Sequence, residues 1–252
     1  MRELKSYEKC LQDACDYAGI TLNEQMLDMF EIYYTELIDW NEKINLTAIT
    51  DKQDVYLKHF ADSIYGTKFM PQNCFLCDIG TGAGFPAVVV KIVRPDIVIT
   101  LVDALEKRIK FLNELITKLG LINITALHFR AEDVKFKQSY LNRFDIVTAR
   151  AVAKMNTLTE YCLPFVKPNG KFVAYKSNKI EQEVLDCKKA VQVLGGGNID
   201  LKKYQLDAKT SRLIVVVDKI KGTDNKYPRD KNRPKLKPIM WLQSWHIEKN
   251  EF

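Results

Sequence analysis

Three glycines at alternate positions, Gly80, Gly82 and Gly84, directly follow the apolar run 75–79 and constrain the fold more than any other feature. Glycine tolerates the backbone angles of a tight turn and allows a ligand to approach the main chain closely. The next apolar run ends at Asp103, 19 residues after Gly84. A carboxylate there can accept hydrogen bonds from both hydroxyls of a ribose. The pattern predicts a strand, a turn and a helix that bind a nucleoside-containing cofactor.

Short apolar runs alternate with amphipathic segments over the middle and last part of the chain. We expect strands at 75–79, 97–102, 123–128, 144–148, 171–175, 201–206 and 213–219, and helices at 85–93, 104–119, 150–166 and 178–194. Such alternation is typical of right-handed βαβ units. It predicts an α/β fold with a seven-stranded, mainly parallel sheet and helices on both sides. No helix separates the last two strands, so they should form an antiparallel hairpin.

The first 70 residues have a helical pattern of apolar residues. One predicted helix ends at Gly19, a second has an apolar face from Met26 to Ile38 and ends near Trp40, and a third begins at Asp51. The Pro residues at 228, 234 and 238 should break any helix near the C-terminus. We therefore expect an N-terminal helical cap over 1–70, an α/β domain over 71–220 and a basic tail over 221–252.

The size and composition of the chain exclude several classes of protein. A chain of 252 residues that is 46% hydrophobic can bury one large core. It contains no run of 18 or more apolar residues, so no transmembrane helix is expected. The first residues are charged and polar, unlike a signal peptide, which predicts a cytoplasmic protein without a membrane partner.

Cys74 and Cys77 have the spacing of half a zinc or redox site. They fall in the first predicted strand, where positions three apart point to opposite faces of the sheet. Such a pair cannot hold one ion together, and no second close pair of Cys or His accompanies it. We expect reduced, buried cysteines and no metal site.

The details of the glycine turn indicate which cofactor it binds. A dinucleotide site would place a glycine three residues after Gly82, but Phe85 stands there, and an acid, Asp78, ends the strand. The pattern Asp-x-Gly-x-Gly-x-Gly instead resembles that of class I, Rossmann-like, S-adenosylmethionine-dependent methyltransferases. This resemblance implies that Asp103 holds the ribose and that Glu132, after the third strand, faces the adenine amine. A purely structural turn and a dinucleotide site are the alternatives.

The segment after the fourth strand bears on the methyl acceptor. Residues 148–153 contain no Asn/Asp-Pro-Pro-aromatic segment, which disfavours methylation of exocyclic amines, and no cysteine-nucleophile motif for pyrimidine C5 is present. N7 of guanine exposes a lone pair at neutral pH and needs no general base, so alignment alone can accelerate its methylation. Arg150 would then bind a ligand, and it is the one candidate for a catalytic residue. His59 and Asp62 lie on one helical face, where they could form a dyad or pack the cap against the core.

Six segments, taken in their order along the chain, give a more specific resemblance. They are WNEKINLTAI at 40–49, HFADSI at 59–64, DIGTGAGFP at 78–86, LVDALEKR at 101–108, RAE at 130–132 and ARAVA at 149–153. Together they resemble the bacterial 16S ribosomal RNA (guanine-N7)-methyltransferase G family, also called glucose-inhibited division protein B. The resemblance implies methylation of guanine 527 of 16S rRNA. The cofactor-binding residues that it implies, with those of the glycine motif, are Asp78, Gly80, Gly82, Phe85, Asp103, Ala131, Glu132 and Arg150.

The net charge of +6 is concentrated near the C-terminus. Residues 219–238 contain eight Lys or Arg and two Asp, which suits an arm laid along phosphates. The candidate RNA-binding residues are Lys176, Lys226, Arg229, Lys231, Arg233, Lys235 and Lys237.

The expected partner is 16S rRNA or the small ribosomal subunit, and the expected state is a monomer. A noncatalytic rRNA-binding or ribosome assembly factor is the main alternative, and a nicotinamide oxidoreductase is a third. The extension with Trp241 and Trp245 could stack on bases or cover the core.

Overall fold

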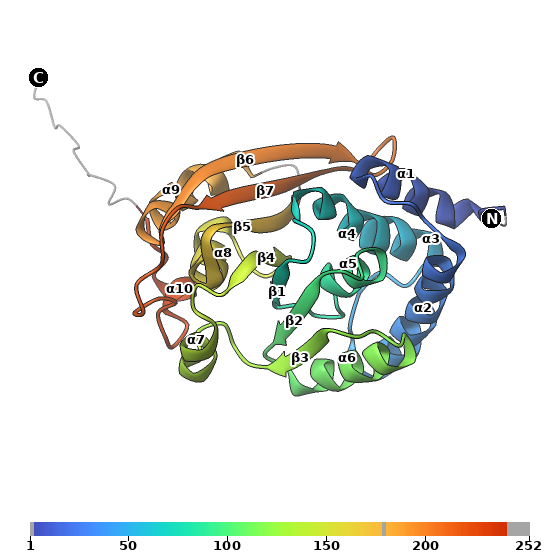
Figure 1. Cartoon of the computed structure of the whole chain (residues 1–252), viewed down its shortest axis with the longest axis horizontal. Helices are drawn as coiled ribbons and strands as arrows, with labels where there is room; N and C mark the ends of the chain where they lie inside the picture. The colour runs from blue at the N-terminus through green and yellow to red at the C-terminus, as the bar shows by residue number, and fades with distance from the viewer. Residues whose placement is uncertain (1–2, 178–179, 241–252) are drawn as a thin grey trace, which may run out of the picture.

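A seven-stranded sheet forms the centre of the protein in a computed structural model, which describes residues 3–177 and 180–240 (Figure 1). The strands are β1 (Phe75–Ile79), β2 (Val98–Asp103), β3 (Ile124–His128), β4 (Phe144–Arg150), β5 (Val166–Ser177), β6 (Gly196–Gln205) and β7 (Ser211–Lys219), in the order β3-β2-β1-β4-β5-β7-β6. Strands β1 to β5 are parallel, and β7 is antiparallel to both β5 and β6. The predicted α/β class and the antiparallel hairpin are confirmed.

The order of the strands determines where a ligand can bind. Strand β1 pairs with β2 on one side and with β4 on the other, so Asp78 lies between Leu101 and Thr148. The connections run in opposite directions from β1, and a crevice opens outside the carboxyl ends of the strands at such a point. The glycine turn follows β1 at this edge.

Helices cover both faces of the sheet (Figure 1). On one side lie α1 (Lys9–Ala18), α2 (Glu24–Ile44), α3 (Lys52–Val55), α4 (Asp62–Tyr65), α5 (Ala87–Val93) and α6 (Glu106–Lys118). On the other lie α7 (Val134–Tyr140), α8 (Met155–Cys162), α9 (Glu181–Val193) and α10 (Arg233–Leu236). Each face of the sheet has its own hydrophobic core, and the N-terminal helices share theirs with α5 and α6.

Several boundaries differ from the sequence predictions. Strand β4 continues to Arg150 and a turn follows, so α8 begins at Met155 and not at 150. Helix α2 continues past Trp40 to Ile44 and ends where Asn45 adopts a φ of 50°. Helix α7 was not predicted, because only Phe136 in it is buried and it has little apolar periodicity. The prediction that proline excludes a helix near the C-terminus was wrong: Pro234 lies in the first turn of α10, where proline is tolerated.

The two faces of the sheet separate Cys74, the residue before β1, from Cys77 within β1. Cys74 belongs to the core on the α5 side and Cys77 to the core on the α8 side, so they do not converge, as their spacing predicted. Across residues 3–177 and 180–240, no group of three or more His, Cys, Asp or Glu side chains could hold a metal ion. None of the described helices is both long enough and apolar enough to cross a membrane.

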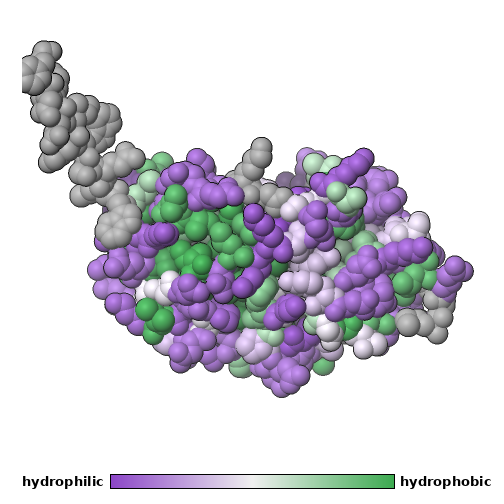
Figure 2. All heavy atoms as spheres, turned by 90° about the horizontal axis from the view of Figure 1, so that it is seen from above, coloured by the Kyte–Doolittle hydropathy of each residue, from purple (hydrophilic) through white to green (hydrophobic). Residues whose placement is uncertain are grey.

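The edge strand β6 carries exposed charged side chains, Asp200, Lys202 and Lys203 among them. Figure 2 views the molecule from the β6 side, and most of this face is hydrophilic. Charges on an edge strand disfavour pairing with a strand of another chain.

Candidate functional site

The glycine turn is held tightly by its neighbours. Gly80 and Gly84 have φ values of 70° and 94°. A Cβ on Gly84 would lie 2.7 Å from the hydroxyl of Tyr33, and one on Gly80 would lie 2.7 Å from Cγ2 of Val152. The Tyr33 hydroxyl donates a hydrogen bond of 2.6 Å to the carbonyl oxygen of Ala83. Only glycine fits these two positions, and helix α2 holds the turn through the hydrogen bond of Tyr33.

Asp103 connects the end of β2 to the same turn. Its side chain is 3% exposed, Oδ2 accepts a 2.9 Å hydrogen bond from the amide of Gly82, and Oδ1 accepts one of 2.9 Å from the amide of Leu105. Arg108 approaches Oδ2 to 3.1 Å. Each carboxylate oxygen has two acceptor positions. Gly82 and Arg108 take both of those on Oδ2, whereas the second contact of Oδ1, from Arg108, is a long one of 3.5 Å, so Oδ1 is the atom that can accept from a ligand.

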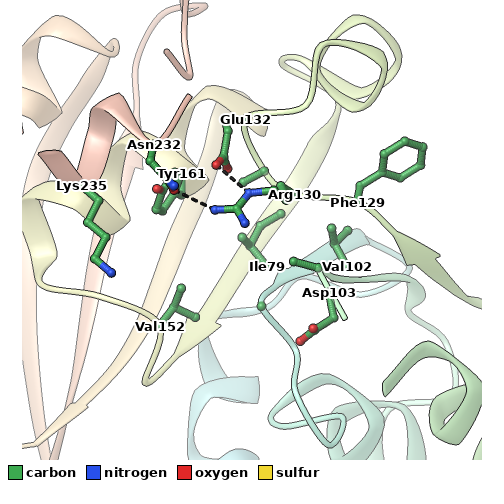
Figure 3. Close-up of a pocket in the computed structure, with 13 residues that line it drawn as sticks. Ile79, Val102, Asp103, Phe129, Arg130, Glu132, Val152, Tyr161, Asn232 and Lys235 are labelled. Carbon is green, nitrogen blue, oxygen red and sulfur yellow. Dashed lines mark hydrogen bonds and ion pairs between the residues drawn. The ribbon is translucent and has the colours of Figure 1, made fainter. Parts of the chain in front are cut away.

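A cavity of about 290 Å³, which we call the β2–β3 cavity, opens beside Asp103 (Figure 3). Four of the candidate cofactor-binding residues line it: Gly80, Asp103, Ala131 and Glu132. Its apolar walls include Ile79, Val102 and Val152. The two buried acids provide acceptors for a ligand that carries hydroxyl and amine donors, and the cations Arg130 and Lys235 belong to the same lining.

The C-terminal segment forms one wall of the β2–β3 cavity. Arg130 pairs with Glu132 at 2.8 Å and donates a 2.7 Å hydrogen bond to Oδ1 of Asn232. Asn232 and Lys235 both line the cavity, and Figure 3 shows Lys235 across from Asp103. Lys235, which was a candidate for RNA binding, therefore lies beside the candidate cofactor residues.

Asp78 lies beneath the turn and does not line the cavity. Its Oδ1 accepts a 2.8 Å hydrogen bond from the Thr148 hydroxyl, whereas Oδ2 is buried without a partner among the described residues. Burial raises the pKa of Asp78 to about 7, although the Thr148 hydrogen bond and the charge of Arg150 act in the opposite direction. Asp78 is thus a buried carboxyl that binds a proton far more readily than an exposed one.

Replacing this carboxyl should stabilise the protein more at high pH than at low pH. Between the usual value of 3.8 and the raised pKa near 7, the folded chain keeps a proton that the unfolded chain loses, so the wild-type protein loses stability as pH rises. Relative to wild type, the free energy of unfolding of Asp78→Asn should therefore increase from pH 5 to pH 8, by up to about 1.4 kcal/mol per pH unit. Urea unfolding at several pH values measures it. Asp28→Asn, at an exposed position, is the control, and a pH-independent difference for Asp78→Asn would contradict the assignment.

Arg150 lies at the end of β4 in a second group of polar residues. Its NH1 donates to Asp62 Oδ2 at 3.0 Å, and its NH2 lies 3.2 Å from Nδ1 of His59. The guanidinium also lies over the ring of Phe85, 4.9 Å from the centroid. Phe85 is buried between Tyr33 and His59, with centroid distances of 5.3 Å and 4.6 Å. Arg150 and Phe85 thus form one cluster, outside the residues that line the β2–β3 cavity.

His59 and Asp62 both contact the guanidinium of Arg150. A guanidinium can only donate, so Nδ1 of His59 accepts from it, and Nε2 carries the proton, 2.9 Å from the Thr47 hydroxyl. Burial and the charge of Arg150 lower the pKa of His59 to about 3. The imidazole is therefore neutral at physiological pH, and its contacts with Thr47 and Arg150 fit packing of the cap against the core, one of the two roles that the sequence allowed.

A family profile, GidB or rRNA small subunit methyltransferase G, matches residues 26–213. "Ribosomal RNA small subunit methyltransferase G" from Lactobacillus johnsonii is 47% identical over 226 residues, 88% of this chain and 95% of that protein. The protein of the same name from Geobacillus sp. is 47% identical over 224 residues, 88% of this chain and 94% of that protein. The chain belongs to the rRNA small subunit methyltransferase G family. It is an S-adenosylmethionine-dependent methyltransferase. A solved S-adenosylmethionine-dependent O-methyltransferase from Thermotoga maritima aligns at 17% identity and a TM-score of 0.47, over 75% of this chain and 73% of that one.

The acceptor groups of the β2–β3 cavity fit the hydrogen-bond donors of this family's cofactor. S-adenosylmethionine carries ribose hydroxyls and an adenine amine, and Asp103 and Glu132 present carboxylate oxygens for such donors beside apolar walls. The positively charged sulfonium would meet no cation from the glycine turn itself. The cavity therefore suits the adenosyl part of the cofactor.

The basic tail residues occupy different environments. Arg229 makes a bidentate pair with Glu160, which is 0% exposed, and its NH2 also donates to the carbonyl oxygen of Lys237. Lys226, Arg229 and Arg233 line another cavity, beside Lys137 of α7. Lys231 is exposed, as is Lys237. Lys176 pairs with Glu183 at 2.8 Å. Trp241 and Trp245 lie outside the described residues.

Sequence reasoning missed several residues at the site. Tyr33, Arg130 and Asn232 were not candidates, although they support the glycine turn or line the cavity. Tyr33 had only the signal of an apolar helix face. Arg130 belongs to the family segment RAE at 130–132, but nothing in the local sequence connects it to Asn232, 102 residues away.

Proposed function

We propose that the protein transfers the methyl group of S-adenosylmethionine to N7 of one guanine in the rRNA of the small ribosomal subunit, guanine 527 in the family's target. The observation that carries the proposal is the β2–β3 cavity, in which residues from the glycine turn, β2 and the β3 loop converge in a chain of this family. The curated relatives bear the name of a small-subunit rRNA methyltransferase, which supports the class of substrate.

Within this proposal each candidate residue has a separate task. Asp103 accepts from the ribose hydroxyls, Glu132 accepts from the adenine amine, and Ala131 lies against the base. The turn from Gly80 to Gly82 leads from this cavity towards Arg150 and Phe85. When bound, S-adenosylmethionine supplies an electrophilic methyl group on its sulfonium.

The described titratable groups around Arg150 are already engaged or enclosed, which fits an acceptor that needs no general base. N7 of guanine attacks with its own lone pair, gains the positive charge that sulfur loses, and releases no proton. His59 is neutral and already engaged with Arg150 and Thr47, and Asp78 is enclosed beneath the turn. Neither is required as a base, so the contribution of the chain is to align the two reactants.

The test is methyl transfer from labelled S-adenosylmethionine to small subunits, or their rRNA, from cells that lack this protein. Label at a single guanine N7 is expected, and the modified nucleotide is mapped by mass spectrometry. No transfer to either substrate, with cofactor binding intact by calorimetric titration, would refute the enzymatic proposal and favour an rRNA-binding assembly factor. A methyl group on another atom would keep the enzyme class and refute N7.

A further inference from the structure

Two adjoining cavities, of about 370 Å³ and 400 Å³, form a groove between α7 and residues 225–233, which we call the α7 groove. They adjoin because Val134 and Lys137 line both of them. Figure 1 shows α7 beside the C-terminal segment that leads into α10. Each cavity is within the range of about 300–1,000 Å³ that is usual for small-ligand sites. The described residues that line the groove include no candidate for cofactor binding, so it is separate from the β2–β3 cavity.

Positive charge dominates the smaller cavity of the α7 groove. Four cations and one acid line it: Lys137, Lys226, Arg229, Arg233 and Asp230. Arg229 is already bound to the buried carboxylate of Glu160. The Lys137 ammonium, in contrast, has no carboxylate partner among residues 3–177 and 180–240. Its N–H donors are therefore available to an anion.

Two more of these cations make ion pairs that a stronger anion can replace. Lys226 lies 3.3 Å from Asp224, and Arg233 lies 3.7 Å from Asp230. The four side chains are 48% to 64% exposed, and ion pairs that are so exposed contribute little to stability. A phosphate group carries a full negative charge and several acceptor oxygens, so it can bind to these two cations and to Lys137.

The α7 groove also presents side chains that suit the bases of a nucleic acid. Tyr227 is half-buried and lines the smaller cavity, and Gln138 and Asn225 line the larger one. An aromatic ring can stack on any base, and an amide side chain both donates and accepts hydrogen bonds. A small free anion would use only the cations. A duplex keeps its bases stacked on one another, so single-stranded RNA matches the whole lining best.

The turn at 230–233 contributes to the α7 groove and to the β2–β3 cavity. Arg233 lines the groove, whereas Asn232 and Lys235 line the cavity. Lys231 and Asn232 have φ values of 53° and 57°, a left-handed conformation that is costly for residues with a Cβ. Such strain is frequent at functional sites. RNA in the groove would therefore lie next to the segment that closes the candidate cofactor site.

We propose that the α7 groove binds a single-stranded segment of the rRNA near the target guanine, with Lys137 on a phosphate and Tyr227 against a base. The inference rests on the proposed function and adds a contact with RNA outside the place of methyl transfer. Because the groove and the β2–β3 cavity have no lining residue in common, loss of a groove residue should weaken RNA binding and leave kcat and cofactor binding unchanged.

The first experiment compares Lys137→Ala, Lys137→Arg and Lys135→Ala with the wild-type protein in filter binding to small-subunit rRNA from cells that lack this protein. Lys135 is exposed on the same helix and lines neither cavity, so its loss is the charge control. Lys137→Ala should raise the Kd for RNA about fivefold at 0.1 M salt and reduce the slope of log Kd against log salt by about 0.7. Lys137→Arg should restore both quantities, and Lys135→Ala should change neither.

The second experiment tests the base contact in the same assay. Tyr227→Leu keeps an apolar side chain against the core but removes the ring, and it should raise the Kd for RNA about tenfold. Tyr227→Phe keeps the ring and should bind RNA as the wild-type protein does. A thermal melt shows that each variant is folded, and calorimetric titration should give one Kd for S-adenosylmethionine in all of them.

Three results would overturn the inference. They are an unchanged Kd for RNA in Lys137→Ala, an equal loss in Lys135→Ala, which would indicate diffuse attraction by charge, and normal RNA binding by a folded Tyr227→Leu protein. A wild-type protein that binds rRNA and the cofactor but transfers no methyl would refute the proposed function, while the binding data would still decide on the groove. A wild-type protein that does not bind rRNA would refute both.

Discussion

Asp103→Ala should weaken the binding of S-adenosylmethionine about a hundredfold, because the ribose hydroxyls lose a charged acceptor that is almost fully enclosed. The same carboxylate holds the amides of Gly82 and Leu105, so the variant also loosens the glycine turn. Calorimetric titration measures the Kd, and a thermal melt shows whether the protein remains folded.

Two further variants identify the cause of the loss. Asp103→Asn keeps one acceptor oxygen and should bind more tightly than Asp103→Ala. Arg108→Ala removes the partly exposed guanidinium 3.1 Å from Asp103 and should have a small effect. Unchanged affinity in a folded Asp103→Ala protein would show that the ribose is held elsewhere.

Arg229→Ala should lower the free energy of unfolding by about 3 kcal/mol, because the carboxylate of Glu160 would remain buried without its partner. The pair is bidentate, with distances of 2.8 Å and 2.6 Å, and Glu160 also accepts from the backbone amide of Arg229. Urea denaturation measures the change. Arg229 was a candidate for RNA contact, but this geometry makes it first of all an anchor for the C-terminal segment.

Lys231→Ala is the control, since Lys231 is exposed in the same segment and should leave stability unchanged. The double variant Glu160→Ala/Arg229→Ala removes both charges and should be destabilised by less than the sum of the single variants. Additive effects, or a neutral Arg229→Ala, would contradict the role of the pair.

Local sequence patterns were sufficient for most of the fold. Strand β1 was predicted at its observed bounds because an apolar run meets a glycine turn, and the β6–β7 hairpin followed from the absence of a helix between two apolar runs. The predictions failed where tertiary contacts override local pattern. Strand β5 begins at Val166, which pairs with Phe144 of β4, but an irregularity follows in which Asn169 has a φ of 69°, and the pairing resumes only at Lys171, where the strand was predicted to begin.

The candidate site was predicted less completely for a related reason. The motif residues near Asp103 follow one another along βα units, so their convergence at one edge of the sheet could be expected. Asn232 reaches the site from a segment far along the chain, and no local spacing indicates its contact with Arg130. His59 and Asp62 gave a local signal, yet their common partner Arg150 is 91 and 88 residues away.

The β2–β3 cavity has all its walls only when the segment with Asn232 and Lys235 is present. The family profile matches residues 26–213, but the wall of the cavity is closed at 232–235. A chain cut off between these points would keep its diagnostic motifs and lack one side of its cavity. A match to the motifs of the family therefore does not establish that a protein can bind the cofactor.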